Sequence, residues 1–328
     1  MPSRRRALLI LALLTGVSAA SVLLALTTGS MRIPLSQVFA AFAGEGGMFA
    51  DVVIGLRLPR ALAGFACGGL LALSGALLQV LLRNPLADPY ILGISGGAGV
   101  GAILSILFGL GVAGIAGASF IGALAAMLLV FGLARGDGSW TQTRLLLTGV
   151  IVAAGCGALV TLILSLAPDH KLHAMLFWIM GDLSQAAHPE LALWTLAAVL
   201  LAALPFAREL NLLARGPDTA LALGARVGAL RRGIYLVASL ATAAAVAQAG
   251  SIGFIGLIVP HLVRLATGSD QRLLLPASAL AGGSLLVVAD TLARTLIAPR
   301  QLPVGVLTAL IGVPVFLFLL ARDSRPRR

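Results

Sequence analysis

Charged residues and cysteines are scarce in this sequence. Asp, Glu, Lys and Arg make up only 11% of its 328 residues, whereas hydrophobic residues make up 59%, and the mean hydropathy is +1.04. This composition excludes a soluble enzyme and predicts a helical bundle that is mostly buried or in contact with lipid. Cys67 and Cys156 both fall within predicted membrane spans, so the sequence supports neither a disulfide nor a metal site.

The longest charge-free stretch of the second half lies between Arg232 and Arg264. One straight helix of about 30 residues would measure about 45 Å, which exceeds the roughly 30 Å hydrocarbon core of a bilayer. Arginines bound the tract at both ends, so we expect it to cross the membrane, turn near Gly250 and Ser251, and cross back. Pro260 should break the returning helix, and broken helices at membrane depth are typical of proteins in which they line a transport pathway.

The remaining apolar runs predict an all-α polytopic membrane protein with about ten spans, some short or broken, in one domain over residues 1–328. A retained first span is favoured over a cleaved signal peptide because the apolar run from 7 to 26 exceeds a usual signal core. The uncharged tract 91–133 should hold two spans with a turn at 109–114. Its glycines fit close helix packing better than a dinucleotide-binding loop, because no strand precedes them.

The formal net charge of +11 is distributed unevenly across this predicted topology. Acidic residues divide evenly between the two sides, whereas seventeen of the 23 basic residues fall on one side. The positive-inside rule makes that side cytoplasmic, together with both termini, so the basic excess reflects topology and not nucleic-acid binding. The seventeen are Arg4, Arg5, Arg6, Arg83, Arg135, Arg144, Arg208, Arg215, Arg226, Arg231, Arg232, Arg264, Arg272, Arg322, Arg325, Arg327 and Arg328.

Three long motifs carry a family resemblance. They read SGALLQVLLRNPLADPYILGISGGAG from Ser74, GSIGFIGLIVPHLVR from Gly250 and LPVGVLTALIGVPVF from Leu302. The chain resembles the FecCD-type permease subunits of ABC importers for iron–siderophore complexes, haem and cobalamin. One departure is Gln301, where the family usually has Glu before Leu-Pro-Val-Gly.

The resemblance implies a multi-pass permease of the bacterial inner membrane that binds no cofactor and catalyses no reaction. It implies a homodimer that works with two cytoplasmic ABC ATPase subunits and one periplasmic substrate-binding protein. The chain has no G-x-x-x-x-G-K-[ST] motif, so a separate polypeptide must use ATP and Mg²⁺. An iron–siderophore complex is the first expectation for the cargo, followed by cobalamin and haem.

The resemblance also implies three groups of functional residues. The arginines at the mouths of two spans, which by themselves fit interfacial snorkelling equally well, would dock the binding protein: Arg57, Arg60 and Arg294. A short turn with two prolines would form part of the cytoplasmic gate: Asn84, Pro85, Leu86, Asp88 and Pro89. The basic loop 207–232 would couple to the ATPase, chiefly through Asp218, Leu221, Gly224, Ala225, Arg226 and Val227.

Local patterns add detail to these groups. Pro217 with Asp218 or Thr219 predicts a helix start, and Gly224 and Gly228 predict a tight turn between two short helices. Asp290 and Arg294 are spaced i, i+4 on a predicted span, so they can pair and lower the cost of placing each charge in lipid.

Two other interpretations remain open from the residues alone. The string Gly93-Ile94-Ser95-Gly96 is similar to that of rhomboid-type intramembrane serine proteases, and His261 is the only histidine at membrane depth that could pair with Ser95. His170 and His173 share one face of a short helix expected within 167–190 and could bind a metal. No third ligand is evident, so exposed histidines are favoured and no metal site is predicted.

Overall fold

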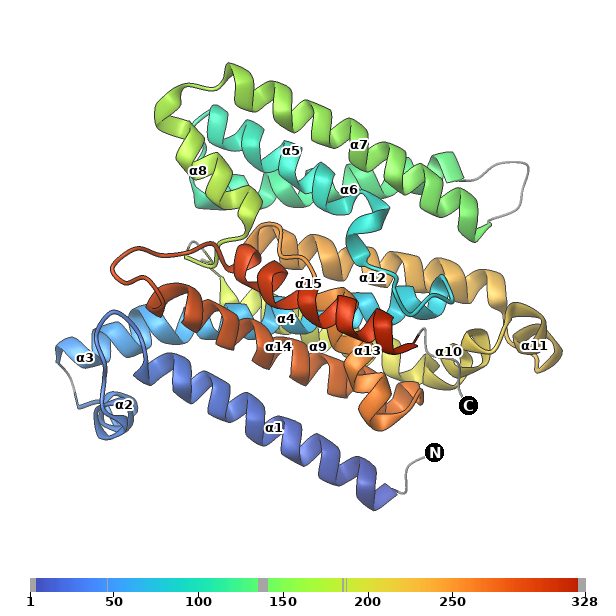
Figure 1. Ribbon diagram of the computed structural model, residues 1–328, viewed down its shortest axis with the longest axis horizontal. Helices are drawn as coiled ribbons and strands as arrows, with labels where there is room; N and C mark the ends of the chain where they lie inside the picture. Colours follow the sequence, from blue (N-terminus) through green and yellow to red (C-terminus); the bar gives the residue numbers. More distant parts are fainter. Residues whose placement is uncertain (1–3, 46, 135–140, 185, 187, 324–328) are drawn as a thin grey trace.

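Figure 1 presents the computed structural model, which describes residues 4–45, 47–134, 141–184, 186 and 188–323. All regular elements among these residues are helical, as the sequence predicts. Within the described part of the chain, seven helical segments are long and apolar enough to cross a membrane, and three shorter apolar helices accompany them. The long segments are α1 (Arg4–Thr27), α3–η1–α4, α6 (Val112–Ala134), α7 (Gln142–Leu166), α9–η3–α10, α12 (Val227–Ala249) and α14 (Gln271–Thr295).

Two of the long segments are composite. The first joins α3 (Met48–Ala50), the π-helical η1 (Asp51–Arg57) and α4 (Leu58–Leu81), and the second joins α9 (Pro189–Ala203), the 3₁₀-helical η3 (Leu204–Phe206) and α10 (Ala207–Ala214). The shorter apolar helices are α5 (Ile94–Leu107), α13 (Ile255–Thr267) and α15 (Val304–Asp323). The remaining elements are α2 (Leu35–Phe42), η2 (Pro89–Leu92), α8 (Asp169–Met180) and α11 (Pro217–Ala222).

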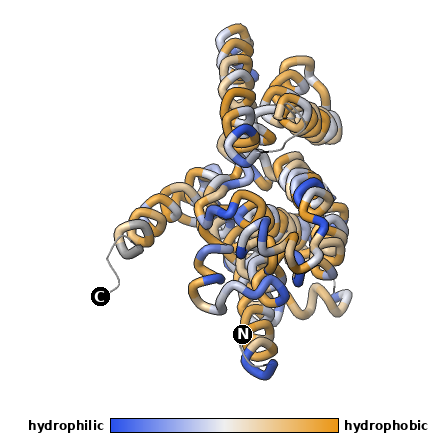
Figure 2. Tube along the Cα trace, turned by 90° about the vertical axis from the view of Figure 1, so that its right-hand side faces the viewer, coloured by the Kyte–Doolittle hydropathy of each residue, from blue (hydrophilic) through white to orange (hydrophobic). Residues whose placement is uncertain are grey.

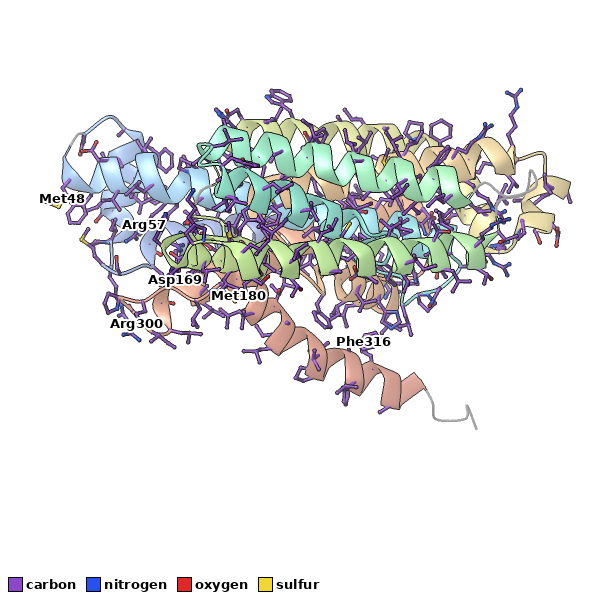
Figure 3. The ribbon with its side chains drawn as sticks, turned by 90° about the horizontal axis from the view of Figure 1, so that it is seen from above. Met48, Arg57, Asp169, Met180, Arg300 and Phe316 are labelled. Atoms are coloured by element: carbon purple, nitrogen blue, oxygen red, sulfur yellow. The ribbon has the colours of Figure 1, made fainter. Side chains whose placement is uncertain are left out.

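The bundle has two distinct ends. Figure 1 shows α10 and α11 at one end, here called the α11 end, and α2 and α3 at the opposite end, here called the α3 end. Helix α1 begins and α15 finishes toward the α11 end, whereas Figure 3 places Met48, Arg57 and Arg300 at the α3 end. Figure 2, viewed from the α11 end, shows helices that are largely hydrophobic and hydrophilic residues gathered near helix ends.

Helix α4 lies at the centre of the structure. Nearly every residue from Ala61 to Leu81 is buried, and α14, α12, α9 and α13 pack around this helix. A Cβ atom at Gly68 would collide with the Gly282 carbonyl of α14, so the small residue permits the close approach of the two backbones. Helices α5, α6, α7 and α8 form a second layer (Figure 1), joined to the first where the Tyr235 hydroxyl donates to the Met127 carbonyl at 2.8 Å.

The uncharged tract 91–133 folds as predicted, because α5 and α6 occupy it with a turn between them. Close packing explains its glycines, since a Cβ at Gly97 would collide with the Gly122 carbonyl. The tract from 232 to 264 also crosses, breaks at Gly250 to Phe254 and returns. The returning helix α13 has 13 residues, about 20 Å, which is shorter than the roughly 30 Å hydrocarbon core, so the non-helical residues 250–254 must make up part of the return.

Two local predictions are wrong. Pro260 does not break the returning helix but lies inside α13. Proline frees the carbonyl four residues earlier, that of Gly256, and this carbonyl lies against Gly75 of α4, which has no side chain to exclude it. Gly228 is the second residue of α12 and not part of the turn, which is made at Gly224 with φ +82°.

Candidate functional site

Three separate groups of polar residues sit at or near the helix breaks and ends. The first is at the α3 end, where α4 and α14 lie side by side. Arg60 grips Asp290 with two nitrogens, Nε at 2.9 Å and Nη2 at 2.7 Å, and Arg294 approaches the same carboxylate at 3.1 Å. The i, i+4 pair predicted from the sequence is therefore present, but Arg60 makes the closer contact.

The side-chain amide of Gln301 connects Arg60 and Asp290 to Asp182. Arg60 also donates to the Gln301 side-chain oxygen at 3.3 Å, and the Gln301 amide donates to Asp182 at 3.2 Å. Asp182 in turn donates its backbone N–H to the Ala249 carbonyl at 2.9 Å, at the end of α12. Gln301, where this chain departs from the family pattern, thus links Arg60 to the break that follows α12.

Arg57 is placed differently from Arg60. Its residue is only 5% exposed, and its guanidinium donates to the carbonyls of Leu26 and Met31, which holds the segment that follows α1. Arg57 belongs to the π-helical turn η1, and this wider turn shifts its angular position relative to Arg60 on α4. The two arginines of the motif therefore reach different partners.

The second group is the turn after α4, which contains the predicted gate residues. Asn84, Pro85 and Leu86 are exposed, and the Asn84 side chain accepts from the Leu86 N–H at 2.9 Å. Asp88 begins η2 by accepting from the Tyr90 N–H at 2.7 Å. Burial raises the pKa of Asp88 to about 6, although that hydrogen bond acts in the opposite direction.

Tyr90, which no sequence motif marks as functional, connects this turn to the break between α12 and α13. Its hydroxyl accepts from the Ile252 N–H at 2.8 Å and donates to the Ile252 carbonyl at 2.9 Å. Two residues after Gly93, the Ser95 hydroxyl lies 2.9 Å from that of Ser251. Unsatisfied backbone groups are costly at membrane depth. The Tyr90 hydroxyl supplies the hydrogen bonds that the Ile252 N–H and carbonyl cannot make within a helix. The sequence feature that could have revealed this contact is the tyrosine that directly follows Asp88-Pro89 in a largely apolar region.

The third group is the segment that contains α10 and α11. Leu221 and Leu223 are 58% and 60% exposed, respectively, and Asp218, Gly224 and Arg226 are also exposed. Ala225 is half-buried, and Val227 is buried at the start of α12. The predicted helix start is confirmed, because α11 begins at Pro217. Two large apolar side chains are therefore exposed between the polar residues Asp218 and Arg226.

The alternative sites are not assembled in the same way. The Ser95 hydroxyl is paired with Ser251, a second hydroxyl, and this arrangement supplies no base to Ser95. His170 and His173 are both exposed, and His173 packs against Phe177 with ring centroids 4.5 Å apart. Among the described residues, no group of three or more His, Cys, Asp or Glu side chains could hold a metal ion.

Comparison with known proteins places these features in a family. The model of the FecCD transport family matches residues 12–322. The cobalamin import system permease protein BtuC of Halobacterium salinarum is 44% identical over 85% of this chain and 75% of its own length. The hemin transport system permease protein HmuU of Yersinia pestis is 44% identical over 84% of each chain.

A solved structure agrees with these sequence matches. An ABC transporter described as of the metal-chelate type, in an inward-facing conformation, superposes with a TM-score of 0.84 at 30% identity. The match covers 96% of this chain and 99% of the other. A family match over nearly the whole length, with the same arrangement of helices, leaves no room for the protease interpretation. This chain therefore belongs to the FecCD transport family.

Proposed function

We propose that this chain is the membrane-spanning permease subunit of a binding-protein-dependent ABC importer that carries an iron–siderophore complex across the bacterial inner membrane. The family match over residues 12–322 is the observation that carries the proposal. Cobalamin and haem are the competing cargoes, because two relatives at 44% identity are named for them. Titrating the cognate binding protein with a ferric siderophore, cobalamin and haem tests the choice, and tight binding of either of the last two overturns it.

The α11 end is the cytoplasmic end in this proposal. The seven long and three short apolar helices allow ten crossings, and an even number agrees with α1 beginning and α15 finishing toward one end (Figure 1). Arginine is concentrated at that end, as the positive-inside rule requires. Labelling of a cysteine placed at Gly224, an exposed turn residue, tests the orientation: access only from outside the cell would reverse it.

Two copies of the chain would form the pathway, with one ATPase beneath each copy. The exposed leucines Leu221 and Leu223 provide the apolar contact for the ATPase, and Asp218 and Arg226 provide a polar rim. ATP and Mg²⁺ remain with the ATPase, and the permease makes or breaks no bond in the cargo. Closure of the ATPase pair moves α11, and the movement reaches the gate residues 84–89 through the adjoining helices.

The α3 end would receive the periplasmic binding protein. Arg60 and Arg294 share one carboxylate, so a positive potential remains there that favours an acidic partner. Arg57 contributes by holding the segment from 26 to 31 in place. Arg294→Gln tests docking with least damage, because Arg60 still neutralises Asp290. We expect two- to fivefold weaker binding at low salt, and no change relative to Arg208→Gln at the opposite end would remove Arg294 from the interface.

A further inference from the structure

A cavity of about 900 Å³ at the α11 end is lined by four arginines and lies next to Pro85 of the predicted gate. Arg6 comes from α1, Arg264 from α13, and Arg83 and Arg215 from the turns after α4 and α10. Asp270 is the single acidic residue in the lining. Four segments that are distant in sequence therefore bring an excess of positive charge to one place.

Three of the four arginines, Arg83, Arg215 and Arg264, have no acidic partner among the described residues. The Asp270 carboxylate is already engaged, because it accepts from the Asn211 amide at 2.9 Å and from the Arg272 N–H at 3.1 Å at the start of α14. The positive charge of the cavity is therefore available to an anion from outside.

Two arginines are held in position. The Arg264 Nη2 donates at 2.9 Å to the side-chain oxygen of Gln79, which is 3% exposed and anchored in turn to the Leu257 carbonyl at 3.1 Å. Only one of the five donors of Arg264 is used in this bond. Arg83 adopts a left-handed backbone with φ +47°, an unfavourable conformation for a side chain other than glycine.

The cavity also contains an unmatched acceptor. The side-chain oxygen of Gln271 is buried and has no hydrogen-bond partner among the described residues. An occupant that complements the lining must thus offer negative oxygens to the arginines and one donor to Gln271. Phosphate groups beside a hydroxyl have this chemistry, since guanidinium groups bind phosphate oxygens bidentately.

We propose that this cavity binds the headgroup of an anionic phosphoglycerol lipid, with cardiolipin as the best match because a hydroxyl-bearing glycerol joins its two phosphates. The cavity lies beside α1, most of whose residues are exposed on the outside of the bundle, so a lipid can enter from the membrane. Basic pockets between transmembrane helices on the cytoplasmic side bind such headgroups. A volume of 900 Å³ far exceeds a free phosphate and suits a headgroup.

Native mass spectrometry of the purified full chain from cardiolipin-containing nanodiscs tests the proposal. We expect the wild type to retain cardiolipin, and each of Arg83→Gln and Arg215→Gln to reduce retention by about fivefold. Both arginines are exposed, so neither variant threatens folding. Arg272→Gln is the matched control, because Arg272 is an exposed arginine of the same end that does not line the cavity, and it should retain cardiolipin as the wild type does.

Three results would overturn the proposal. Equal retention in the wild type and in the double variant Arg83→Gln with Arg215→Gln would place the lipid elsewhere. Displacement of cardiolipin by inorganic phosphate at equal concentration would make a soluble anion the occupant. Loss of ATPase association with unchanged lipid retention would assign the arginines to the ATPase contact. Lipid retention requires no cargo, so an error in the proposed transport function would leave this measurement unaffected.

Discussion

The two ends of the bundle treat their charged residues in opposite ways. At the α3 end, Arg60 and Arg294 both contact Asp290, which is 3% exposed, and Arg57 donates hydrogen bonds to backbone carbonyls. At the α11 end, Arg83 and Arg215 are exposed and form no ion pair among the described residues. Charges enclosed within one chain stabilise its helix packing, whereas charges left open are available to lipid or to partner proteins.

The contrast is sharpest at Asp290, and Asp290→Asn should produce the largest effect. The substitution leaves two arginines in a mostly buried site without their counter-ion, and removing one member of a buried ion pair costs about 3 to 5 kcal/mol. We expect the free energy of unfolding in detergent to fall by about that amount. Asp218→Asn at the α11 end, where the carboxylate is exposed, should change it by no more than about 0.5 kcal/mol. Similar losses in both variants would erase the difference between the ends.

The middle of the molecule, between the two ends, depends on Tyr90. Tyr90→Phe removes the hydroxyl that hydrogen-bonds to both the N–H and the carbonyl of Ile252. We expect the free energy of unfolding to fall by about 2 kcal/mol and uptake to decrease. Thr161→Val is the control, because it removes an exposed hydroxyl that bonds only within α7. Unchanged stability and uptake in Tyr90→Phe would mean that the break does not rely on the turn after α4.

Exposure at the α11 end can be tested separately from stability. The double variant Leu221→Asp with Leu223→Asp should lower uptake by reconstituted vesicles about tenfold, a loss of about 1.4 kcal/mol in coupling. Its unfolding temperature should stay unchanged, because both side chains are exposed. Thr219→Asp introduces the same type of charge on α11 at a polar exposed position and should transport normally. Normal uptake by the double variant would exclude these leucines from the ATPase contact.

The smallest expected effect is a change in pH dependence at Asp88. Because burial raises its folded pKa to about 6, above an unfolded value of about 3.9, its protonated form favours the folded state. This contribution to stability is complete below pH 4 and disappears as the pH rises through 6. Asp88→Asn should therefore flatten the fall in unfolding temperature between pH 4 and pH 7. Asp218→Asn should leave the slope unchanged, and an identical slope in both variants would show that Asp88 is solvated.

Helix positions were largely predictable from hydrophobicity, because a segment that crosses lipid must satisfy its backbone internally. The two helices of tract 91–133, the break after Gly250 and the start of α11 at Pro217 were all expected from the sequence. Pro260 was misjudged, since proline propensities derive from water, whereas here the freed Gly256 carbonyl packs against Gly75.

The candidate sites were less predictable where partners are distant in sequence. Asp290 and Arg294 were paired from their spacing, but Arg60, which is 230 positions from Asp290, was not assigned to it. Arg57 was expected to act with Arg60, and the π-helical turn η1 separates them. Tyr90 went unnoticed because its partner is a backbone group that becomes available only when α12 ends.

The sequence by itself determined the all-helical membrane architecture, the concentration of arginine on one side and the family, because these follow from local hydrophobicity, charge and motifs. Only the tertiary structure decided which arginines are neutralised, which helix break Tyr90 completes and where four arginines meet around one cavity. These features depend on the close packing of helices that are far apart in the chain, and no local pattern of residues encodes such distances.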